Sequence, residues 1–195
     1  MSISVQYIID CDTYNRGCGR GLTWNAYNFL RRKGYFLWNE YKSDYLGVQR
    51  TCTAALYNAR KLTGMNPLIF PPLNIDQLKR LVSYQPVTVL LNAPACLKSY
   101  KSGVLRDEDC KCTSDNYLTA EVEQSAVVIG YSTTILTLGC QGYWIVKNSW
   151  GEKWGENGYV RLCMPVNTVK NYLGMCNVQA FVQLPNVGLI PFDDE

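Results

Sequence analysis

The pattern of apolar residues changes at Pro86, and this change limits the possible folds more than any other feature of the sequence. Before it, apolar residues recur at helical spacing over 23–34 and 74–84, which begin at the potential caps Thr23 and Asn74. After it come short segments rich in β-branched and aromatic residues, which are typical of strands: "VTVLLNA", "AVVIGYS", "YWIVKNSW", "GYVRL" and "QAFVQL". The pattern predicts an α+β protein.

We accordingly expect two lobes and a tail. Residues 1–85 form a helical lobe, residues 86–185 pair as antiparallel strands into a barrel-like lobe, and residues 186–195 form an acidic C-terminal tail. Within the first lobe, the stretch 35–73 is rich in aromatic and turn residues and is expected to be mostly coil.

Composition excludes several functional classes. A net charge of +3 is too small to indicate a nucleic acid or an acidic membrane surface as partner. No apolar run is long enough to span a bilayer, and no cofactor is indicated. The N-terminal "MSISVQYIIDCD" lacks the basic and apolar regions of a signal peptide, which slightly favours an intracellular protein complex and leaves the compartment open.

The sequence contains no histidine. No Cys–His or Ser–His catalytic pair and no histidine metal ligand can therefore form within the chain. A general base near neutral pH would have to be a carboxylate, lysine or cysteine with a shifted pKa.

Nine cysteines leave at least one thiol unpaired within the chain. Their number suggests a disulfide-bearing secretory ancestry, but the absence of a signal peptide slightly favours thiols. Cys110 and Cys112 have the chemistry of metal ligands, yet the second cysteine pair of a zinc site is missing from the motif. Structural or free thiols are therefore favoured, and no metal site is predicted.

Several motifs resemble the papain-like cysteine protease family, in order along residues 2–185. The most specific is "YWIVKNSWGEKWGENGYVRL" (143–162), which is similar to the segment around that family's catalytic asparagine. The segments "SVQYIIDCDTYNRGCGRG", "YLGVQRTC", "YKSGVL" and "GMCNV" also have family counterparts. The resemblance implies a papain-like two-lobe fold whose helical lobe is incomplete, because the family's central helix would precede the first matching segment.

In that family a thiolate, a histidine, an asparagine and an oxyanion-binding glutamine carry the reaction. The resemblance places the asparagine at Asn148, with Trp150 as its aromatic cover, and puts Gln124 (or, with a gap, Ser125) where the histidine belongs. The family's cysteine and glutamine would lie before the first residue. We therefore expect an N-terminally truncated, catalytically inactive member in which Asn148 and Trp150 are structural.

Cysteines and a glycine-rich loop extend the resemblance. The loop Cys18-Gly19-Arg20-Gly21 is similar to the family's substrate-binding loop, but Arg20 adds bulk and charge where the family has glycine, which argues against peptide binding in the family mode. The resemblance pairs Cys11 with Cys52 and either Cys110 or Cys112 with Cys176. It leaves Cys18 without its family partner and assigns no role to Cys96, Cys140 and Cys163.

Apolar residues without an obvious cover are candidates for binding other protein chains. Trp24, Tyr27 and Trp38 lie in the lobe that lacks the family's central helix. Ile135 and Leu136 lie in the apolar loop 133–142, which is equally expected to fold onto its own domain.

Together these features predict a pseudo-protease that is not an enzyme and acts as a structural or binding subunit of a multi-subunit protein assembly. One alternative is the C-terminal chain of a two-chain cysteine peptidase, with catalytic groups from the other polypeptide. Another is a decoy that binds protease substrates or propeptides.

Overall fold

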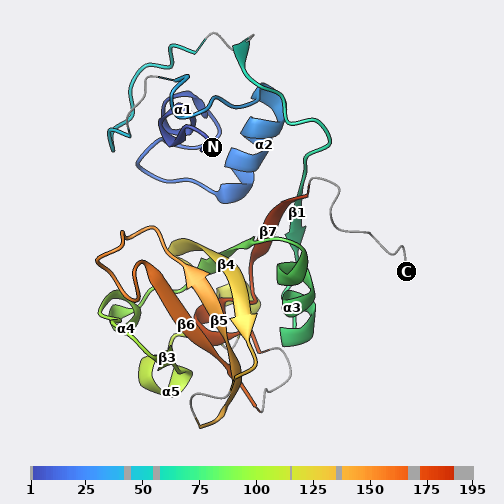
Figure 1. The fold of residues 1–195 in the computed structure, drawn as a ribbon, viewed down its shortest axis with the longest axis vertical. Helices are drawn as coiled ribbons and strands as arrows, with labels where there is room; N and C mark the ends of the chain where they lie inside the picture. Colours follow the sequence, from blue (N-terminus) through green and yellow to red (C-terminus); the bar gives the residue numbers. More distant parts are fainter. Residues whose placement is uncertain are drawn as a thin grey trace. The chain divides into compact units, whose positions relative to one another are not determined.

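The computed structural model describes residues 2–41, 45–54, 58–114, 116–134, 138–166 and 172–186. The chain divides into two compact units, one of residues 1–68 with 185–195 and one of residues 69–184. Their elements are labelled in Figure 1. The predicted tail lies almost entirely outside the described residues.

The first unit contains helices α1 (Val5–Cys11) and α2 (Thr23–Lys33). Ser4 caps α1, because its hydroxyl accepts a hydrogen bond from the Tyr7 N–H at 3.2 Å. Thr23 was expected to be the N-cap residue of α2, but it is the first residue of the helix. Leu22 is the N-cap residue, and its side chain makes no cap hydrogen bond. Gly34 ends α2 with a φ of 88°, a conformation that favours glycine.

Aromatic rings form the core of this first unit. Tyr7 is fully buried, and its ring centroid lies 5.3 Å from Phe29, 4.9 Å from Phe36 and 5.4 Å from Tyr41. The Cys11–Cys52 disulfide joins the end of α1 to the chain segment that follows α2. Phe29 is therefore covered within this unit and does not depend on another chain for its burial.

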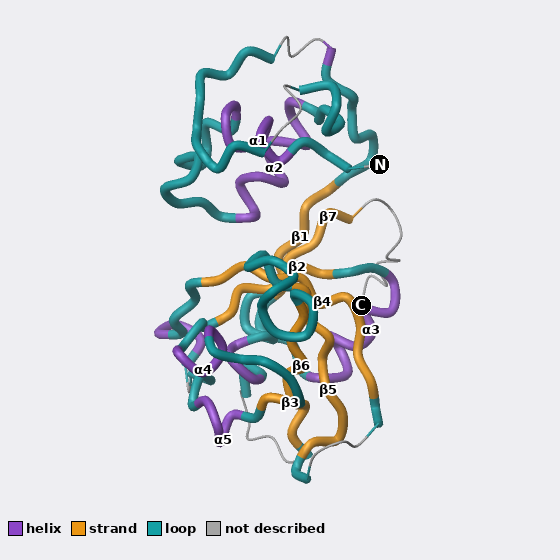
Figure 2. The backbone as a smooth tube through the Cα atoms, turned by 60° about the vertical axis from the view of Figure 1, so that its left-hand side comes forward, coloured by secondary structure: helices purple, strands orange, loops and turns teal. Residues whose placement is uncertain are grey.

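A seven-stranded sheet has the order β1-β7-β2-β4-β5-β6-β3. Its strands are β1 (Asn66–Phe70), β2 (Val87–Leu91), β3 (Val104–Leu105), β4 (Gln124–Ser132), β5 (Cys140–Lys147), β6 (Tyr159–Pro165) and β7 (Val182–Asn186). Figure 2 shows the long strands β4, β5 and β6 side by side. Along β5, Cys140, Gly142, Trp144 and Val146 are buried and alternate with more exposed residues, so one face of the strand meets the core.

Helix α3 (Ile75–Tyr84) packs on this sheet. Asn74 and Gln77 form a capping box at its start, and Leu78, Leu81 and Val82 are buried. The Lys79 ammonium lies 5.8 Å from the centroid of the Tyr131 ring on β4. Because α3 buries its apolar side against strands, the division expected after residue 85 falls inside the second unit.

Four shorter helical segments complete the described elements: α4 (Ala95–Lys98), α5 (Asp107–Cys110) and the 3-10 turns η2 (Tyr117–Thr119) and η3 (Met175–Asn177). Among the described helices, none combines the length and the apolar character that a membrane span needs.

One sequence-based expectation about the sheet is wrong. The sheet is open rather than barrel-like, because β1 and β3 stand at its two ends and the two-residue β3 pairs only with β6, in parallel. The described residues of 35–73 are mostly coil, as expected, but they include the five-residue β1, which pairs with the distant β7. Such pairing is non-local and leaves little trace in the sequence of β1 itself.

Candidate active site

Gln124 and Asn148 meet because neighbouring strands run antiparallel. Val127 on β4 is paired with Lys147 on β5. The same register, followed beyond the end of β5, sets Gln124 beside the residues after Lys147. The alternation that buries Val146 continues to Asn148, which is 9% exposed.

The Gln124 side chain holds a small polar cluster together. Its Nε2 shares two hydrogens among three acceptors: Asn148 Oδ1 at 2.9 Å, Ser149 Oγ at 3.1 Å and the Ser125 carbonyl at 2.9 Å. Its Oε1 accepts one from Trp150 Nε1 at 3.1 Å. We call Gln124, Asn148, Ser149 and Trp150 the amide cluster.

Backbone bonds fix the other side of the amide cluster. Asn148 Oδ1 also accepts from the Ser149 N–H at 2.7 Å, so two donors occupy this oxygen. The Asn148 N–H donates to the Gly158 carbonyl at 2.9 Å. Asn148 is thus held by neighbours on both its side chain and its backbone.

Trp150 of the amide cluster packs against a second tryptophan, Trp154. Trp150 meets Trp154 edge to face, with centroids 5.0 Å apart. Trp154 is 9% exposed, and its Nε1 donates to the carbonyls of Leu97 at 3.2 Å and Lys98 at 3.1 Å. The Trp154 indole that packs against Trp150 is therefore anchored to the chain segment at α4.

The chemistry of the amide cluster is binding and orientation. Carboxamide, hydroxyl and indole groups donate and accept hydrogen bonds but do not exchange protons near neutral pH. The hydroxyl-bearing Ser149 is exposed, whereas Gln124 and Trp150 are half-buried. Ligand groups can reach the cluster at its Ser149 side.

The glycine-rich loop 18–21 belongs to the first unit. Its backbone closes on itself, since the Arg16 N–H donates to the Arg20 carbonyl and the Gly19 N–H donates to the Arg16 carbonyl, both at 2.8 Å. The exposed Cys18 thiol donates to the Gly47 carbonyl at 3.4 Å. Gly19, Arg20 and Gly21 are exposed as well.

The candidate partner-binding residues fall into three groups. Trp24 and Tyr27 are half-buried on α2. Trp38 is 39% exposed, and its N–H donates to the Ser2 carbonyl at 2.9 Å. Ile135 and Leu136 lie outside the described residues.

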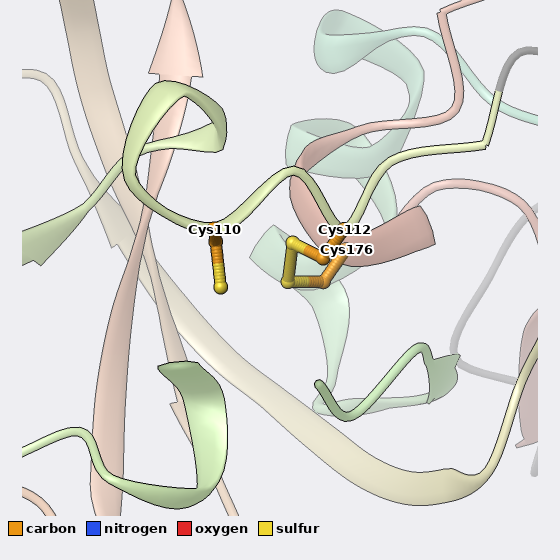
Figure 3. Close-up of side chains that lie close together, drawn as sticks. All are labelled: Cys110, Cys112 and Cys176. Carbon is orange, nitrogen blue, oxygen red and sulfur yellow. A yellow bond between two sulfur atoms is a disulfide. The ribbon is translucent and has the colours of Figure 1, made fainter. Parts of the chain in front are cut away.

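Eight cysteines form four disulfides, whereas the sequence slightly favoured thiols. The structure joins Cys11 to Cys52 and, of the two alternatives, selects Cys112 as the partner of Cys176. It adds two bonds that were not predicted, Cys96–Cys110 and Cys140–Cys163. Figure 3 shows Cys110 beside the Cys112–Cys176 bond.

Sequence reasoning missed two features of the amide cluster. Ser149 was not singled out, although it follows Asn148 directly and shares the Gln124 amide with it. The bond between Gln124 and Trp150 was also missed. Pairing "AVVIGYS" with "YWIVKNSW" in antiparallel register would have brought both residues to Gln124.

Known proteins match nearly the whole chain. The family model described as "Papain family cysteine protease" matches residues 1–185. The cysteine proteinase COT44 of Brassica napus is 33% identical over 187 residues, which are 95% of this chain and 52% of the relative. The senescence-specific cysteine protease SAG12 of Arabidopsis thaliana is 35% identical over 191 residues, covering 96% and 50%.

Solved structures agree on the fold. The bromelain protease from Ananas comosus in complex with the E64 inhibitor gives a TM-score of 0.76 at 29% identity, covering 95% of this chain and 78% of that chain. The Carica candamarcensis protease CMS1MS2 with E-64 gives 0.74 at 26% identity, covering 95% and 77%. The chain spans about half the length of the curated relatives it matches.

These matches overturn one prediction from the sequence. The chain was predicted not to be an enzyme, but the family model and the similar proteins are cysteine proteases, and these are enzymes. The papain-like α+β fold is confirmed.

Proposed function

Because this chain belongs to the papain family of cysteine proteases, we propose that it forms the sheet-bearing part of a cysteine peptidase whose nucleophilic thiol and proton-transferring imidazole come from a second polypeptide. One observation carries the proposal: the family's reaction uses a histidine, and this sequence contains none. In this proposal the imidazole comes from outside residues 1–195, on a second polypeptide. This is the two-chain arrangement that the sequence left open as an alternative.

The amide cluster offers a place for that imidazole. An amide oxygen can accept two hydrogen bonds, and among the described residues only Trp150 donates to Gln124 Oε1. An imidazole N–H from the second polypeptide can donate to the remaining position. Gln124 would then orient the ring, while Asn148 and Trp150 hold Gln124 in place.

Orienting the imidazole would raise the rate of peptide hydrolysis by holding the ring in its reactive position. Misplacing a catalytic group by about 1 Å lowers a rate by about a hundredfold. Gln124 is suited to positioning because its amide is fixed from both ends, at Nε2 by Asn148 and at Oε1 by Trp150. In this proposal Gln124 is a positioning residue and transfers no proton itself.

The test uses the tagged chain isolated from the cells that naturally express it. We expect the isolate to hydrolyse peptides and to be blocked by E-64, the inhibitor bound in two of the similar structures. In such isolates Gln124→Leu lowers kcat by about a hundredfold with a smaller effect on KM, and Ser125→Ala changes neither. Isolates without E-64-sensitive hydrolysis would refute the proposal.

A second candidate function is binding to other protein chains through the first unit. It is favoured by the exposure of Leu22 (56%) and Trp38 (39%), since tryptophan is enriched at interfaces. In the tagged isolate, Trp38→Asp and Trp24→Asp should release co-purifying chains, whereas Asn148→Ala should retain them. Retention of every chain by both tryptophan variants would contradict this role. Peptide binding without hydrolysis would instead support the decoy.

A further inference from the structure

The positive charge of this chain is concentrated in residues 1–68, which belong to the first unit. They contain nine lysines and arginines and four aspartates and glutamates, whereas residues 69–195 contain ten and twelve. No acidic residue occurs from 13 to 39 or from 45 to 75. The whole-chain net charge of +3 therefore conceals one strongly basic part of the molecule.

Four exposed cationic side chains gather where α2 ends. Arg31, Arg32 and Lys33 form the last turn of this helix, and all three are exposed. Lys61 comes from a distant segment, and its Nζ donates a hydrogen bond to the Lys33 carbonyl at 3.2 Å. We call Arg31, Arg32, Lys33 and Lys61 the basic surface. It lies at one end of the helix labelled α2 in Figure 1.

Backbone pairing holds the two segments of the basic surface next to each other. The Tyr35 N–H donates to the Arg60 carbonyl, and the Arg60 N–H donates to the Tyr35 carbonyl, both at 2.9 Å. Gly34 permits this approach, because a Cβ atom there would collide with the Arg60 carbonyl oxygen. The fold itself therefore places Lys61 at the end of α2.

The described acidic side chains of this unit do not neutralise the basic surface. Asp10 and Asp12 are buried, and Glu40 is bound by Arg60, whose Nη2 lies 2.6 Å from its Oε1. Among the described residues, no carboxylate forms an ion pair with the basic surface. The other acidic residues of the unit lie outside the described part of the chain: Asp44, Asp193, Asp194 and Glu195.

A role in helix stability explains only part of this arrangement. A cation in the last turn of a helix interacts favourably with the helix dipole. One such side chain is enough for that role, and several like charges close together repel one another. An external anion would remove the repulsion, so the basic surface is suited to binding one.

The two arginines keep most of their N–H groups available for an anion. Arg32 Nη1 donates to the Tyr14 hydroxyl at 2.9 Å, and its guanidinium lies 5.7 Å from the centroid of that ring. Arg31 Nη2 donates to Asn28 Oδ1 at 3.4 Å. A guanidinium with neutral partners can still bind two oxygens of a sulfate or carboxylate. The Tyr14 ring is 48% exposed and offers an apolar face beside these charges.

We propose that the basic surface binds an anionic polysaccharide through its sulfate or carboxylate groups. Four disulfides are typical of chains that mature in an oxidising compartment, where such polysaccharides occur and nucleic acids are uncommon. Protein interfaces are depleted in lysine and centre on buried anchors, whereas the basic surface consists of exposed, long charged side chains. The exposed Tyr14 ring provides a contact for the C–H groups of a sugar.

The experiment measures binding of the purified, disulfide-bonded chain to fluorescent polymers by anisotropy. Dextran sulfate carries sulfate groups only, and polygalacturonate carries carboxylates only, so the pair identifies the anionic group. Polyglutamate and single-stranded DNA represent an acidic protein and a nucleic acid, and neutral dextran is the blank. We expect one of the two charged polysaccharides to bind at least about tenfold more tightly than polyglutamate or DNA at about 0.05 M NaCl. Tighter binding of polyglutamate or DNA, or no binding of either charged polysaccharide, would overturn the proposal.

A triple variant tests the assigned residues. Arg31→Gln, Lys33→Gln and Lys61→Gln together should weaken binding of the preferred polysaccharide by at least about tenfold. The slope of log Kd against log salt concentration should fall by about two, because fewer counterions are released. Arg31→Gln alone should weaken binding by about twofold to threefold, and an unchanged affinity and slope in both variants would refute the assignment.

A second triple variant is the matched control. Lys101→Gln, Lys147→Gln and Lys153→Gln remove the same charge from exposed positions of the second unit and should change Kd by less than about twofold. Near-ultraviolet circular dichroism should be the same for both triples and the unaltered chain. An equal loss of affinity in the two triples would show that total charge alone governs binding, and the proposal would fail.

The proposal does not rest on the proposed peptidase role. Binding is measured on the purified chain without hydrolysis, and the amide cluster contains none of the substituted residues. Either proposal can therefore fail while the other holds.

Discussion

Gln124 Nε2 donates a hydrogen bond to Asn148 Oδ1 at 2.9 Å, which joins the first residue of β4 to the residue that follows the end of β5. Trp150 donates back to the same side chain at 3.1 Å. Gln124 therefore links two residues that the sequence resemblance placed in the catalytic region.

Removal of the Gln124 amide should destabilise the fold. Gln124→Leu leaves the Trp150 Nε1–H without this acceptor and removes one of the two donors to Asn148 Oδ1, and a buried polar group left unpaired costs about 1–3 kcal/mol. Urea unfolding followed by tryptophan fluorescence should report a loss of that size. Ser125→Ala, at the exposed neighbouring position, should change the unfolding free energy by less than about 0.5 kcal/mol. Equal effects of the two substitutions would contradict the role of the amide.

Two tyrosines of the first core should respond in opposite directions to replacement by phenylalanine. The Tyr7 hydroxyl is buried without a partner among the described residues, and burial, followed by the charge of Tyr41, raises its pKa to about 12. Tyr7→Phe should raise the unfolding free energy by up to about 2 kcal/mol.

Tyr41→Phe provides the comparison. It removes a bond of 3.0 Å from the Tyr41 hydroxyl to Asp10 Oδ2 and should cost about 1.5–3 kcal/mol. Thermal unfolding of both variants checks the pair. A loss of stability on Tyr7→Phe as large as that on Tyr41→Phe would show that the Tyr7 hydroxyl has a partner after all.

Stability should fall in acid through the ion pair of Glu156 and Arg161. Arg161 Nε donates to Glu156 Oε2 at 2.9 Å, and this bond, against burial, lowers the pKa of Glu156 below its usual 4.5. Because the pKa of Glu156 is lowered in the folded state, the contribution of this ion pair to the free energy of unfolding is complete above pH 4.5. It disappears as the pH falls below that value.

The variant Glu156→Gln should remove this part of the acid dependence. Its unfolding free energy should be lower than that of the unaltered chain at pH 7, and the difference should shrink toward pH 3. Glu152→Gln, at an exposed turn position, should keep the original profile. Parallel profiles for Glu156→Gln and the unaltered chain would contradict the assignment.

The disulfide pattern predicts one reactive thiol in the folded, oxidised chain. Cys18 is the free cysteine and is exposed, while the other eight are paired. Alkylation without reductant should add one label, at Cys18, and peptide mapping should find the four stated pairs. Label on Cys110 or Cys176 would instead show that the adjacent pairs have rearranged.

Local signals explain which elements were predictable. Helices over 23–34 and 74–84 are found as Thr23–Lys33 and Ile75–Tyr84, because a capping box and a terminal glycine are encoded next to them. Strand β1 was missed because "NPLIF" depends on pairing with β7, more than a hundred residues later. The open sheet was missed because closure depends on how its end strands pair, which no local pattern records.

The candidate site was predictable to a similar extent. The resemblance pointed to Gln124, Asn148 and Trp150, but their mutual hydrogen bonds follow from strand register and not from the motif. The pair Cys96–Cys110 links α4 to α5 and could not be assigned from spacing. Truncation and the covering of the first unit by a partner stay predictions.

The trans imidazole is the central claim, and chemical modification of histidine tests it most directly. The tagged chain isolated from its native cells is treated with diethyl pyrocarbonate, assayed for E-64-sensitive hydrolysis and analysed by mass spectrometry. Because the chain has no histidine, we expect activity to be lost as one histidine of a co-purifying polypeptide is modified, and hydroxylamine to restore both. Hydrolysis that survives full modification, or that the purified chain performs alone, would contradict the account.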